Sequence, residues 1–475
     1  MREEYDCLGK MMLPDDVYYG IQTQRVKELS SLTGTPVIRY PYLHNRLAYM
    51  KKAAALANKQ IGELDPDIAE AIAWAADRVL AGGYEEHFPI DILQGGGYTC
   101  VNMNMNEVLA HLANEKLTGH KGYDRVHPNT HVNMGQSTND MITSAGVMAI
   151  GPAIDALLPH LIDLHIALEE KIVEFQDVIK VGRTCLQDAV PMTLGQEFSG
   201  YASLIARQIE NIRSLRKDCN TIIVGATAVG TGMGAFPGYQ DAFYQILQDE
   251  LKETITLHSN LFDGMQNGDY YIKVSAAVKQ AACSLSKIAK DMRLLSSGPR
   301  GGFGEISLPA LSPGSSIMPG KINPIAPELM TQAAQITIGN DMVITTAVEQ
   351  GELEINVWEP TIYKCLFESF HVLTNAIPVF SNKCIKGITA NREVCLRYAS
   401  STLALSTVVS TALGYTEGVR VSHYAHTNGL TVRQAVLEMK IMSEQEANLL
   451  LDPALLANPE KMSQALADWR SIRNK

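Results

Sequence analysis

Two serines, a lysine and an asparagine lie close together in the loop formed by residues 314–324. The loop reads Gly-Ser-Ser-Ile-Met-Pro-Gly-Lys-Ile-Asn-Pro, and its glycines and prolines predict a shaped, non-helical segment. Ser315 and Ser316 carry hydroxyl groups, whereas Lys321 and Asn323 carry a charge and an amide that can bind an anion. The set predicts a site that holds an anionic substrate and moves a proton.

Three other segments are rich in glycine, asparagine, serine and threonine, and each lies at the edge of a stretch with helical periodicity. They span residues 94–107, 127–140 and 182–197. Glycine lets backbone N–H groups approach a ligand closely, and Ser, Thr and Asn side chains donate hydrogen bonds to carboxylate oxygens. Such clusters are often only turns, but three of them in one chain predict a polar cradle for a small dianion.

The composition is that of a soluble globular protein, with 46% hydrophobic and 19% charged residues. The length of 475 residues predicts two to four domains or one elongated helical body. A net charge of −11 without blocks of like charge argues against nucleic acid and membrane as partners. The eight cysteines are scattered, without zinc-like spacing, and no signal segment or run of 18 apolar residues occurs. We therefore expect a reduced, cytoplasmic protein without a metal site.

The elements that must position these residues are mainly helices. Apolar residues from Ile154 to Ile172 recur with the spacing of an amphipathic helix, and Pro152 is expected in its first turn, where proline is tolerated. Similar patterns predict helices at residues 204–215, 274–295 and 327–342. Strand-like runs are short, such as residues 178–181. Long helices with more than one apolar face favour a bundle shared between subunits.

Gentle changes in composition place two domain boundaries, near residues 140 and 393. We expect an N-terminal domain with pocket loops at residues 1–140. A central long-helix bundle domain, which carries loop 314–324, is expected at residues 141–393. A small helical C-terminal domain is expected at residues 394–475.

Loop 314–324 resembles the signature loop of the aspartase/fumarase superfamily, and the likeness extends over nearly the whole chain. It includes the three polar segments and residues 18–25, 225–232, 297–300 and 386–391. The resemblance implies a mainly α, three-domain subunit whose long helices form a central bundle in a homotetramer. It also implies active sites built from three subunits and chemistry without a metal or organic cofactor. The branch with the strongest resemblance is that of the aspartate ammonia-lyases.

The resemblance assigns a role to each polar residue of the predicted site. Ser315 matches the general base, which takes a proton from the carbon β to the leaving amine in an anti elimination. Lys321 and Asn323 match the pair that binds the α-carboxylate, and Ser316 is expected to bind substrate beside the base. The residues that match the polar cradle are Thr99, Ser137, Thr138, Asn139 and Thr184. A serine can act as a base only in a dry, positive site with backbone donors.

Four pocket positions depart from the aspartase pattern, and Glu28-Leu29-Ser30 stands where Glu-Asn-Phe is usual. Tyr98 takes the place of a glycine, and Cys100 takes the place of a serine. Cys185 replaces a His or Gln, and Trp358 replaces a Met. Aromatic faces suit a methylated ammonium, so the altered pocket resembles that of the ergothionase branch, which eliminates trimethylamine from ergothioneine and yields thiourocanate. We therefore expect Tyr98 and Trp358 to lie near the leaving amine or the ring.

The leading interpretation is a carbon–nitrogen lyase that acts on ergothioneine. The alternative is an aspartate ammonia-lyase in which the four changed residues are neutral drift. A fumarase is a third reading, against which the missing histidine at Cys185 counts. A fourth is an inactive structural tetramer, against which the intact Ser315, Lys321 and Asn323 count.

Four further residues lie near these motifs. Lys51 and Lys52 are expected to be structural or solvated rather than catalytic. His131 could cap or pack as readily as bind substrate, and the sequence leaves the role of Glu359 open.

Overall fold

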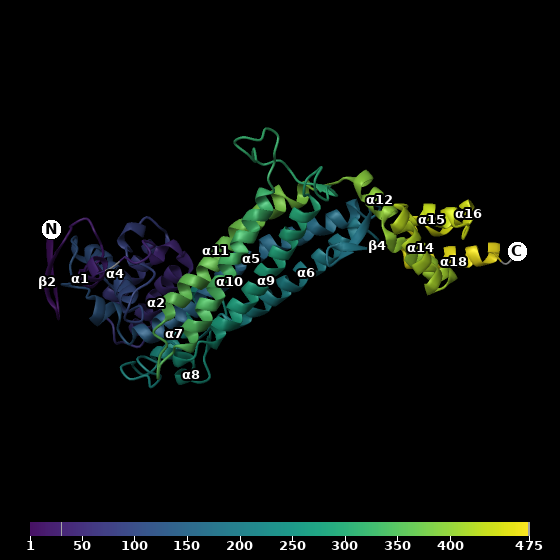
Figure 1. Cartoon of the computed structure of the whole chain (residues 1–475). Helices are drawn as coiled ribbons and strands as arrows, with labels where there is room; N and C mark the ends of the chain where they lie inside the picture. Colours follow the sequence, from purple (N-terminus) through teal and green to yellow (C-terminus); the bar gives the residue numbers. More distant parts are fainter. Residues whose placement is uncertain (30, 474–475) are drawn as a thin grey trace. The chain divides into compact units, whose positions relative to one another are not determined.

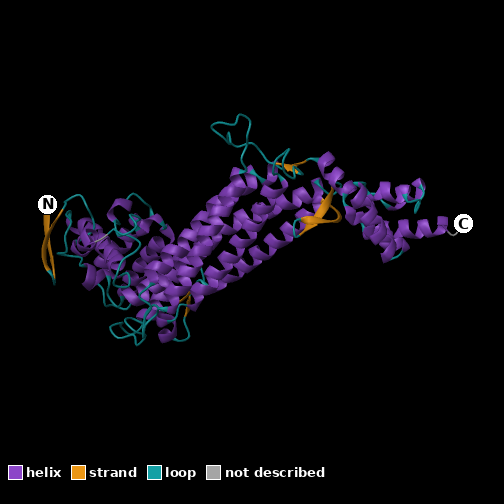
Figure 2. Ribbon diagram, in the orientation of Figure 1, coloured by secondary structure: helices purple, strands orange, loops and turns teal. Residues whose placement is uncertain are grey.

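The structure, a computed structural model, describes residues 1–29 and 31–473 and is mainly α-helical (Figures 1 and 2). The chain forms two compact units. Unit 1 comprises Met1–Pro159, Glu210–Ala282 and Ala333–Thr374, and unit 2 comprises His160–Ile209, Cys283–Gln332 and Asn375–Lys475. Five long helices contribute residues to both units: α5 (Thr138–Glu174), α6 (Leu194–Leu215), α9 (Asp269–Leu295), α10 (Ile325–Glu349) and α11 (Glu359–Lys383).

The long helices confirm the apolar periodicity of the sequence, because the four predicted helices lie within α5, α6, α9 and α10. The start of α5 was predicted wrongly. The helix begins at Thr138, so Pro152 lies inside it rather than in its first turn. By length and composition α5 could span a membrane, but 72% of its most apolar window is buried within the protein, which makes it a core helix.

Unit 1 contains the N-terminal helices and two small sheets. Its remaining helices are α1 (Ile21–Leu29), α2 (Pro41–Gln60), α3 (Pro66–Leu80), α4 (Thr99–Thr118), α7 (Tyr239–Leu251) and α8 (Leu261–Gln266). Its strands are β1 (Arg2–Asp6) with β2 (Gly9–Leu13), antiparallel, and β5 (Thr221–Ile222) with β6 (Thr256–Leu257), parallel. Helix α2 packs against α3 and α7 through buried alanines, whose small side chains allow a close approach.

Unit 2 contains two antiparallel strand pairs and the C-terminal helices. The strands are β3 (Ile179–Thr184) with β4 (Gln187–Thr193), and β7 (Ile306–Ser307) with β8 (Thr389–Ala390). The helices are α12 (Arg392–Ser401), α13 (Ser406–Leu413), α14 (Tyr415–Asn428), α15 (Val432–Glu438), α16 (Glu444–Leu450), α17 (Pro453–Leu456) and α18 (Pro459–Arg473). β3 confirms the short strand predicted at residues 178–181.

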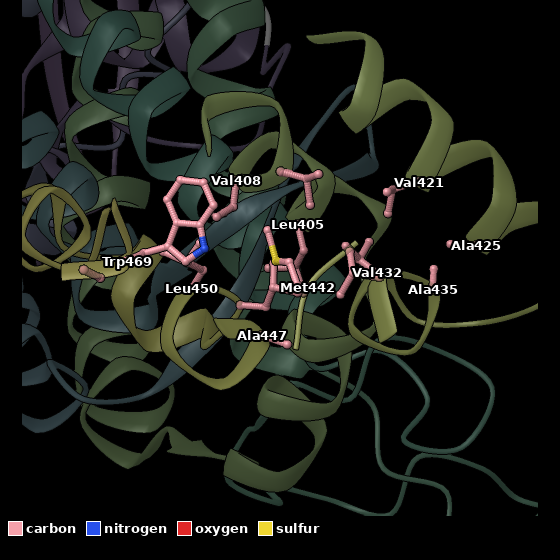
Figure 3. Packing of buried hydrophobic residues seen from close by; sticks show 14 residues of the cluster. Leu405, Val408, Val421, Ala425, Val432, Ala435, Met442, Ala447, Leu450 and Trp469 are labelled. Atoms are coloured by element: carbon pink, nitrogen blue, oxygen red, sulfur yellow. The ribbon is translucent and has the colours of Figure 1, made fainter. Parts of the chain in front are cut away.

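The C-terminal helices have a hydrophobic cluster of their own (Figure 3). It includes Leu405, Val421, Leu450 and Trp469, each at most 4% exposed. The indole Nε1 of Trp469 donates to the Glu446 carboxylate at 3.0 Å. Residues 394–475 fall wholly within unit 2 and residues 1–140 wholly within unit 1. The three-domain division itself stays a prediction.

Replacing Trp469 with alanine tests whether residues 394–475 form a domain. Removing this buried ring should destabilise the cluster by about 3–5 kcal/mol, because it leaves a cavity. Hydrogen exchange, measured segment by segment, should show faster exchange in α13–α18 and unchanged exchange in unit 1. The matched control is Ile472→Ala on the same helix, where the side chain is 42% exposed. Equal loss of protection throughout the chain would contradict an independent domain.

Candidate active site

Loop 314–324 is the last part of the connection between α9 and α10 (Figure 1). It is closed by its own hydrogen bonds. The Gly314 N–H donates to the Lys321 carbonyl oxygen at 2.7 Å, and the Asn323 side-chain amide donates to the Gly314 carbonyl oxygen at 3.0 Å. A Cβ at position 314 would lie 2.7 Å from the Asn323 nitrogen, so only glycine fits there. The loop is therefore a preformed turn, and Asn323 helps to close it.

The Ser315 hydroxyl oxygen accepts two backbone hydrogen bonds. Its donors are the N–H groups of Ile317 at 3.2 Å and Met318 at 3.0 Å. Two N–H groups directed at one oxygen stabilise negative charge on it, as an oxyanion hole does. Ser315 is half-buried, whereas Ser316 and Lys321 are exposed. The arrangement supplies the backbone donors that a serine base requires.

Thr184 and Cys185 lie at the exposed tip of the β3–β4 hairpin. Thr184 pairs with Gln187, so the turn consists of Cys185 and Leu186 alone, with φ of 54° and 59°. Two left-handed residues in a two-residue loop follow the right-handed twist of the flanking strands. Both Thr184 and Cys185 are exposed, as substrate-facing residues would have to be in a single subunit.

A buried carboxylate holds the hairpin in place. Arg183 Nη1 lies 2.8 Å and Lys180 Nζ lies 3.5 Å from Glu305 Oε2, and the Glu305 side chain is fully buried. The Arg183 guanidinium also lies over the Phe303 ring, 4.3 Å from its centroid. These contacts fix the strand that leads to Thr184.

Three predicted cradle residues, Ser137, Thr138 and Asn139, lie at the start of α5, where Asp140 organises the backbone. Its two carboxylate oxygens accept N–H groups of Ser137, Gly225 and Thr227, each at 3.0 Å. Asn139 adds a link, because its side-chain amide donates to a backbone carbonyl of the same 225–232 segment at 2.7 Å. Burial raises the pKa of Asp140 to about 6, although the three backbone N–H donors favour the charged carboxylate and act to lower it. One buried side chain thus joins two polar segments.

Lys51 lies behind this segment and is fully buried. Its Nζ donates to Asn133 Oδ1 at 3.1 Å and to Gln136 Oε1 at 2.8 Å. Burial lowers the pKa of Lys51 to about 7. Lys52 forms ion pairs with Asp77 and Glu250. His131 Nδ1 accepts the backbone N–H of His127 at 2.9 Å. These contacts agree with the structural roles expected for both lysines and give His131 a capping contact.

Thr99 begins α4 and is exposed, and its hydroxyl donates to the Gly96 carbonyl oxygen at 2.9 Å. One turn further on, the Asn102 amide donates to Thr138 Oγ1 at 3.2 Å. This bond ties the start of α4 to the start of α5. Free N–H groups and the helix dipole make such N-termini favourable places for negative charge.

The structure therefore divides the predicted site between the units. Unit 1 brings together Thr99, Ser137, Thr138 and Asn139. Unit 2 holds Thr184 and Cys185 on the hairpin and the four polar residues of loop 314–324.

Tyr98 and Cys100 do not have the exposed positions that a pocket lining requires. Tyr98 is 0% exposed, its hydroxyl donates to the Ile92 carbonyl oxygen at 2.9 Å, and its ring stacks on Tyr363 with centroids 5.8 Å apart. Cys100 is buried, and burial raises the pKa of its thiol to about 12, which keeps it neutral. The backbone at the start of α4 turns Thr99 outward and its two neighbours inward. This burial argues against the predicted role of Tyr98 beside the leaving amine.

Trp358 precedes α11 and is 44% exposed. Its Nε1 donates to the Gln350 carbonyl oxygen at 2.9 Å, and its backbone N–H donates to Asn356 Oδ1 at 2.9 Å. The edge of the indole is thus held while part of the ring stays accessible. Trp358 remains available as a specificity residue.

Glu359, whose role the sequence left open, is a buried member of a tyrosine network. Its Oε1 accepts the Tyr363 hydroxyl at 2.9 Å, and the Tyr363 and Tyr271 hydroxyls lie 2.9 Å apart. Burial raises the pKa of Glu359 to about 7. The spacing of four residues between Glu359 and Tyr363 on one helix face was the signal for this pair in the sequence.

Comparisons with known proteins agree on one family. A family model described as "Lyase" matches residues 9–339, and one described as "Fumarase C C-terminus" matches residues 405–458. The aspartate ammonia-lyase of Helicobacter pylori (strain ATCC 700392 / 26695) is 41% identical over 460 residues, which cover 97% of this chain and 98% of that protein. The aspartate ammonia-lyase of Escherichia coli (strain K12) is 39% identical over 470 residues, which cover 98% of each chain.

Solved structures confirm the mainly α fold with long helices. The fumarate lyase:delta crystallin from Brucella melitensis bound to cobalt has a TM-score of 0.93 and 38% identity, with 96% of this chain and 100% of that chain covered. The class II fumarase from Schistosoma mansoni has a TM-score of 0.90 and 33% identity, with 96% of this chain and 99% of that chain covered.

Glu359→Gln tests the buried carboxyl group. Because its pKa is raised from 4.5 to about 7, the folded protein binds this proton more tightly than the unfolded chain does. Its contribution to stability is complete below pH 4.5 and is lost as the pH rises through about 7. Glutamine stays neutral at every pH. Between pH 5 and 8 the free energy of unfolding of the variant should therefore exceed that of the wild type by up to about 3 kcal/mol.

The measurement is chemical unfolding at several pH values and one protein concentration. The matched control is Glu354→Gln, which changes an exposed carboxylate of unit 1. Parallel pH profiles for the wild type and Glu359→Gln would show that the proton on Glu359 is not held more tightly in the folded state.

Proposed function

The chain belongs to the aspartase/fumarase superfamily of lyases, and on this premise we propose that it eliminates ammonia from L-aspartate to give fumarate. The observation that carries the proposal is Ser315, whose hydroxyl oxygen accepts two backbone N–H groups beside Lys321 and Asn323. Relatives named aspartate ammonia-lyase match nearly the full length at about 40% identity, which supports this substrate ahead of ergothioneine.

The proposed reaction begins with Ser315 in its deprotonated form, its hydroxyl proton having passed to solvent, and with proton transfer from Cβ of aspartate to this oxygen. Lys321 and Asn323 bind the α-carboxylate and hold the substrate for this step. The electron pair left on Cβ passes into the neighbouring β-carboxylate and forms a dianion. The C–N bond then breaks, the electron pair forms the double bond of fumarate, and ammonia leaves with its own pair. Ser315 returns its proton to solvent.

The polar cradle stabilises the dianion in this scheme. Thr99, Ser137, Thr138, Asn139 and Thr184 donate hydrogen bonds to the carboxylate on which charge develops, Thr99 after its hydroxyl turns away from the Gly96 carbonyl oxygen. The first four lie at the N-termini of α4 and α5, where backbone N–H groups add to the favourable potential. Donors fixed before the reaction cost no reorganisation when the charge appears, which makes such preorganisation a large catalytic term.

We further propose that the enzyme is a cytoplasmic homotetramer in which three subunits contribute to each site. The resemblance to the superfamily supports this assembly. The division of the polar residues between two units of one chain is consistent with it, because each subunit could supply different parts to different sites.

Ergothioneine is the second candidate substrate. Cys185 is exposed where the family pattern has His or Gln, and the Trp358 ring is partly accessible, so both could face a trimethylammonium group. The burial of Tyr98 removes the strongest aromatic argument for this reading. Aspartate therefore ranks first.

Ser315→Ala tests the proposed base. Loss of a general base should lower kcat by roughly 10²- to 10⁴-fold, because no other group takes the proton from Cβ. Turnover is followed by ultraviolet absorbance with L-aspartate and, in parallel, with ergothioneine. Ser312→Ala is the matched control and should retain most of the activity, because this exposed serine lies outside loop 314–324.

The substrate outcome decides between the two candidates. Turnover of aspartate by the wild type supports the ammonia-lyase. Turnover of ergothioneine alone would overturn it in favour of the trimethylamine-lyase and would make Cys185 and Trp358 specificity residues. Full activity of Ser315→Ala would refute its role as the base with either substrate.

Hybrid tetramers test whether sites are shared. Ser315→Ala and Thr138→Ala subunits, each nearly inactive alone, are mixed under conditions that exchange subunits. If the two residues reach one site from different subunits, up to about a quarter of the sites regain both native side chains. Mixing Ser315→Ala with Lys321→Ala is the control, because both changes lie in one loop and no subunit supplies an intact one. Equal results from the two mixtures would contradict shared sites.

A further inference from the structure

Tyr98 ends a run of three consecutive residues with left-handed backbone conformation. The φ angles are 78° at Gly96, 57° at Gly97 and 61° at Tyr98. Glycine adopts such angles freely, but a residue with a Cβ does so at an energetic cost. Tyr98 stands where the aspartase pattern has a glycine, so the chain has a large side chain at a position whose backbone conformation disfavours one. Such strain persists only where surrounding contacts hold it.

Those contacts come from the side chain of Tyr98 itself. The ring is 0% exposed, and its hydroxyl donates to the Ile92 carbonyl oxygen at 2.9 Å, which closes the segment from residue 92 to residue 98. The ring stacks on Tyr363 at an interplanar angle of 19° with centroids 5.8 Å apart. Burial of an aromatic ring contributes more than the strain costs.

The surface on which Tyr98 rests is itself fixed by three helices of unit 1. Tyr363, on α11, donates its hydroxyl to Glu359 Oε1 at 2.9 Å and lies 2.9 Å from the Tyr271 hydroxyl of α9. Gly146 of α5 makes room for it, because a Cβ at that position would overlap the Tyr363 hydroxyl group. The position of Tyr98 is thus set by a network of buried hydrogen bonds.

The backbone of Tyr98 defines the start of α4. Its carbonyl oxygen accepts the N–H groups of Val101 at 3.0 Å and Asn102 at 3.1 Å. The next residue is Thr99, which is exposed at the cradle. A shift of Tyr98 would therefore move Thr99 and the first free N–H groups of the helix together.

We propose that Tyr98 is a positioning residue, a buried side chain that fixes the left-handed turn before α4 and so places Thr99 for the substrate carboxylate. The part of this proposal that concerns substrate rests on the proposed function. The part that concerns the turn does not, and it can be measured without substrate.

The experiment compares Tyr98→Phe, Tyr98→Gly and Tyr98→Ala in the full chain. Phenylalanine keeps the stacked ring and loses only the bond to Ile92. Glycine removes the ring but also the strain, whereas alanine removes the ring and keeps the strain. Hydrogen exchange of residues 94–102 is measured without substrate, and kcat and KM are measured with aspartate.

Exchange at residues 94–102 should rise most in Tyr98→Ala, by about tenfold or more, less in Tyr98→Gly and least in Tyr98→Phe. kcat should fall about tenfold in Tyr98→Ala with a smaller rise in KM, because Thr99 is placed at the carboxylate on which charge develops, and Tyr98→Phe should restore most of the activity. Gly146→Ala, which displaces Tyr363 without touching the turn, should reproduce the faster exchange. The matched control is Tyr244→Phe, which removes another buried tyrosine bond to a backbone carbonyl, 2.9 Å long, and should leave residues 94–102 unchanged.

Loss of activity in Tyr98→Ala with unchanged exchange at residues 94–102 would overturn the proposal, since Tyr98 would then act on substrate directly. Wild-type behaviour of Tyr98→Ala in both measurements would overturn it as well. If the wild type turns over neither aspartate nor ergothioneine, the proposed function fails, and the order of exchange rates still decides whether Tyr98 fixes the turn.

Discussion

The buried carboxylate of Asp140 is the contact on which the candidate site in unit 1 depends. It accepts three backbone N–H groups, one from the start of α5 and two from residues 225 and 227, and it is fully buried. A carboxylate accepts through both oxygens, so one side chain can satisfy several backbone N–H groups from two segments of the chain. Without it, each buried donor would be left unsatisfied, at about 1–3 kcal/mol apiece. The alignment of Ser137, Thr138 and Asn139 follows from this requirement.

Lys51 shows that a buried charged group, like a buried N–H group, needs hydrogen-bond partners. A buried ammonium is stable only where oxygen atoms surround it, and Asn133 and Gln136 supply them. Asn133 Oδ1 also accepts the Asn102 amide at 3.1 Å, which carries the network into α4. Lys51 and Asp140 thus lie behind the half-buried hydroxyls and amides of residues 137–139 and hold their backbone in place. Donors fixed in this way can bind an anion without a full positive charge beside it.

Much of this arrangement was readable in the sequence because it obeys local rules. The spacing of Ile154, Leu157 and Leu161 gives the buried face of α5, and the glycines and prolines of residues 314–324 give a closed loop. The family resemblance was also readable, since its motifs are contiguous. The burial of Tyr98 could not be predicted from the sequence. The direction of its ring follows from a left-handed backbone, which residue propensities do not predict for tyrosine. The position of Pro152 in the first helical turn was also predicted wrongly. The hydrogen bonds of residues 137–140 start α5 well before the apolar pattern of residues 154–172, so Pro152 lies inside the helix.

Gly146 limits which substitutions the chain could accept during evolution, because it makes room for Tyr363. Tyr363 offers a stacking surface to residue 98 only while position 146 lacks a side chain. A bulky residue at 98 could thus be accepted in descent only after, or together with, glycine at 146 and tyrosine at 363. The same substitution in a background without them would carry the strain without the stacking on Tyr363. Three positions far apart in the sequence are in this way bound to one another, and relatives that change one should change the others.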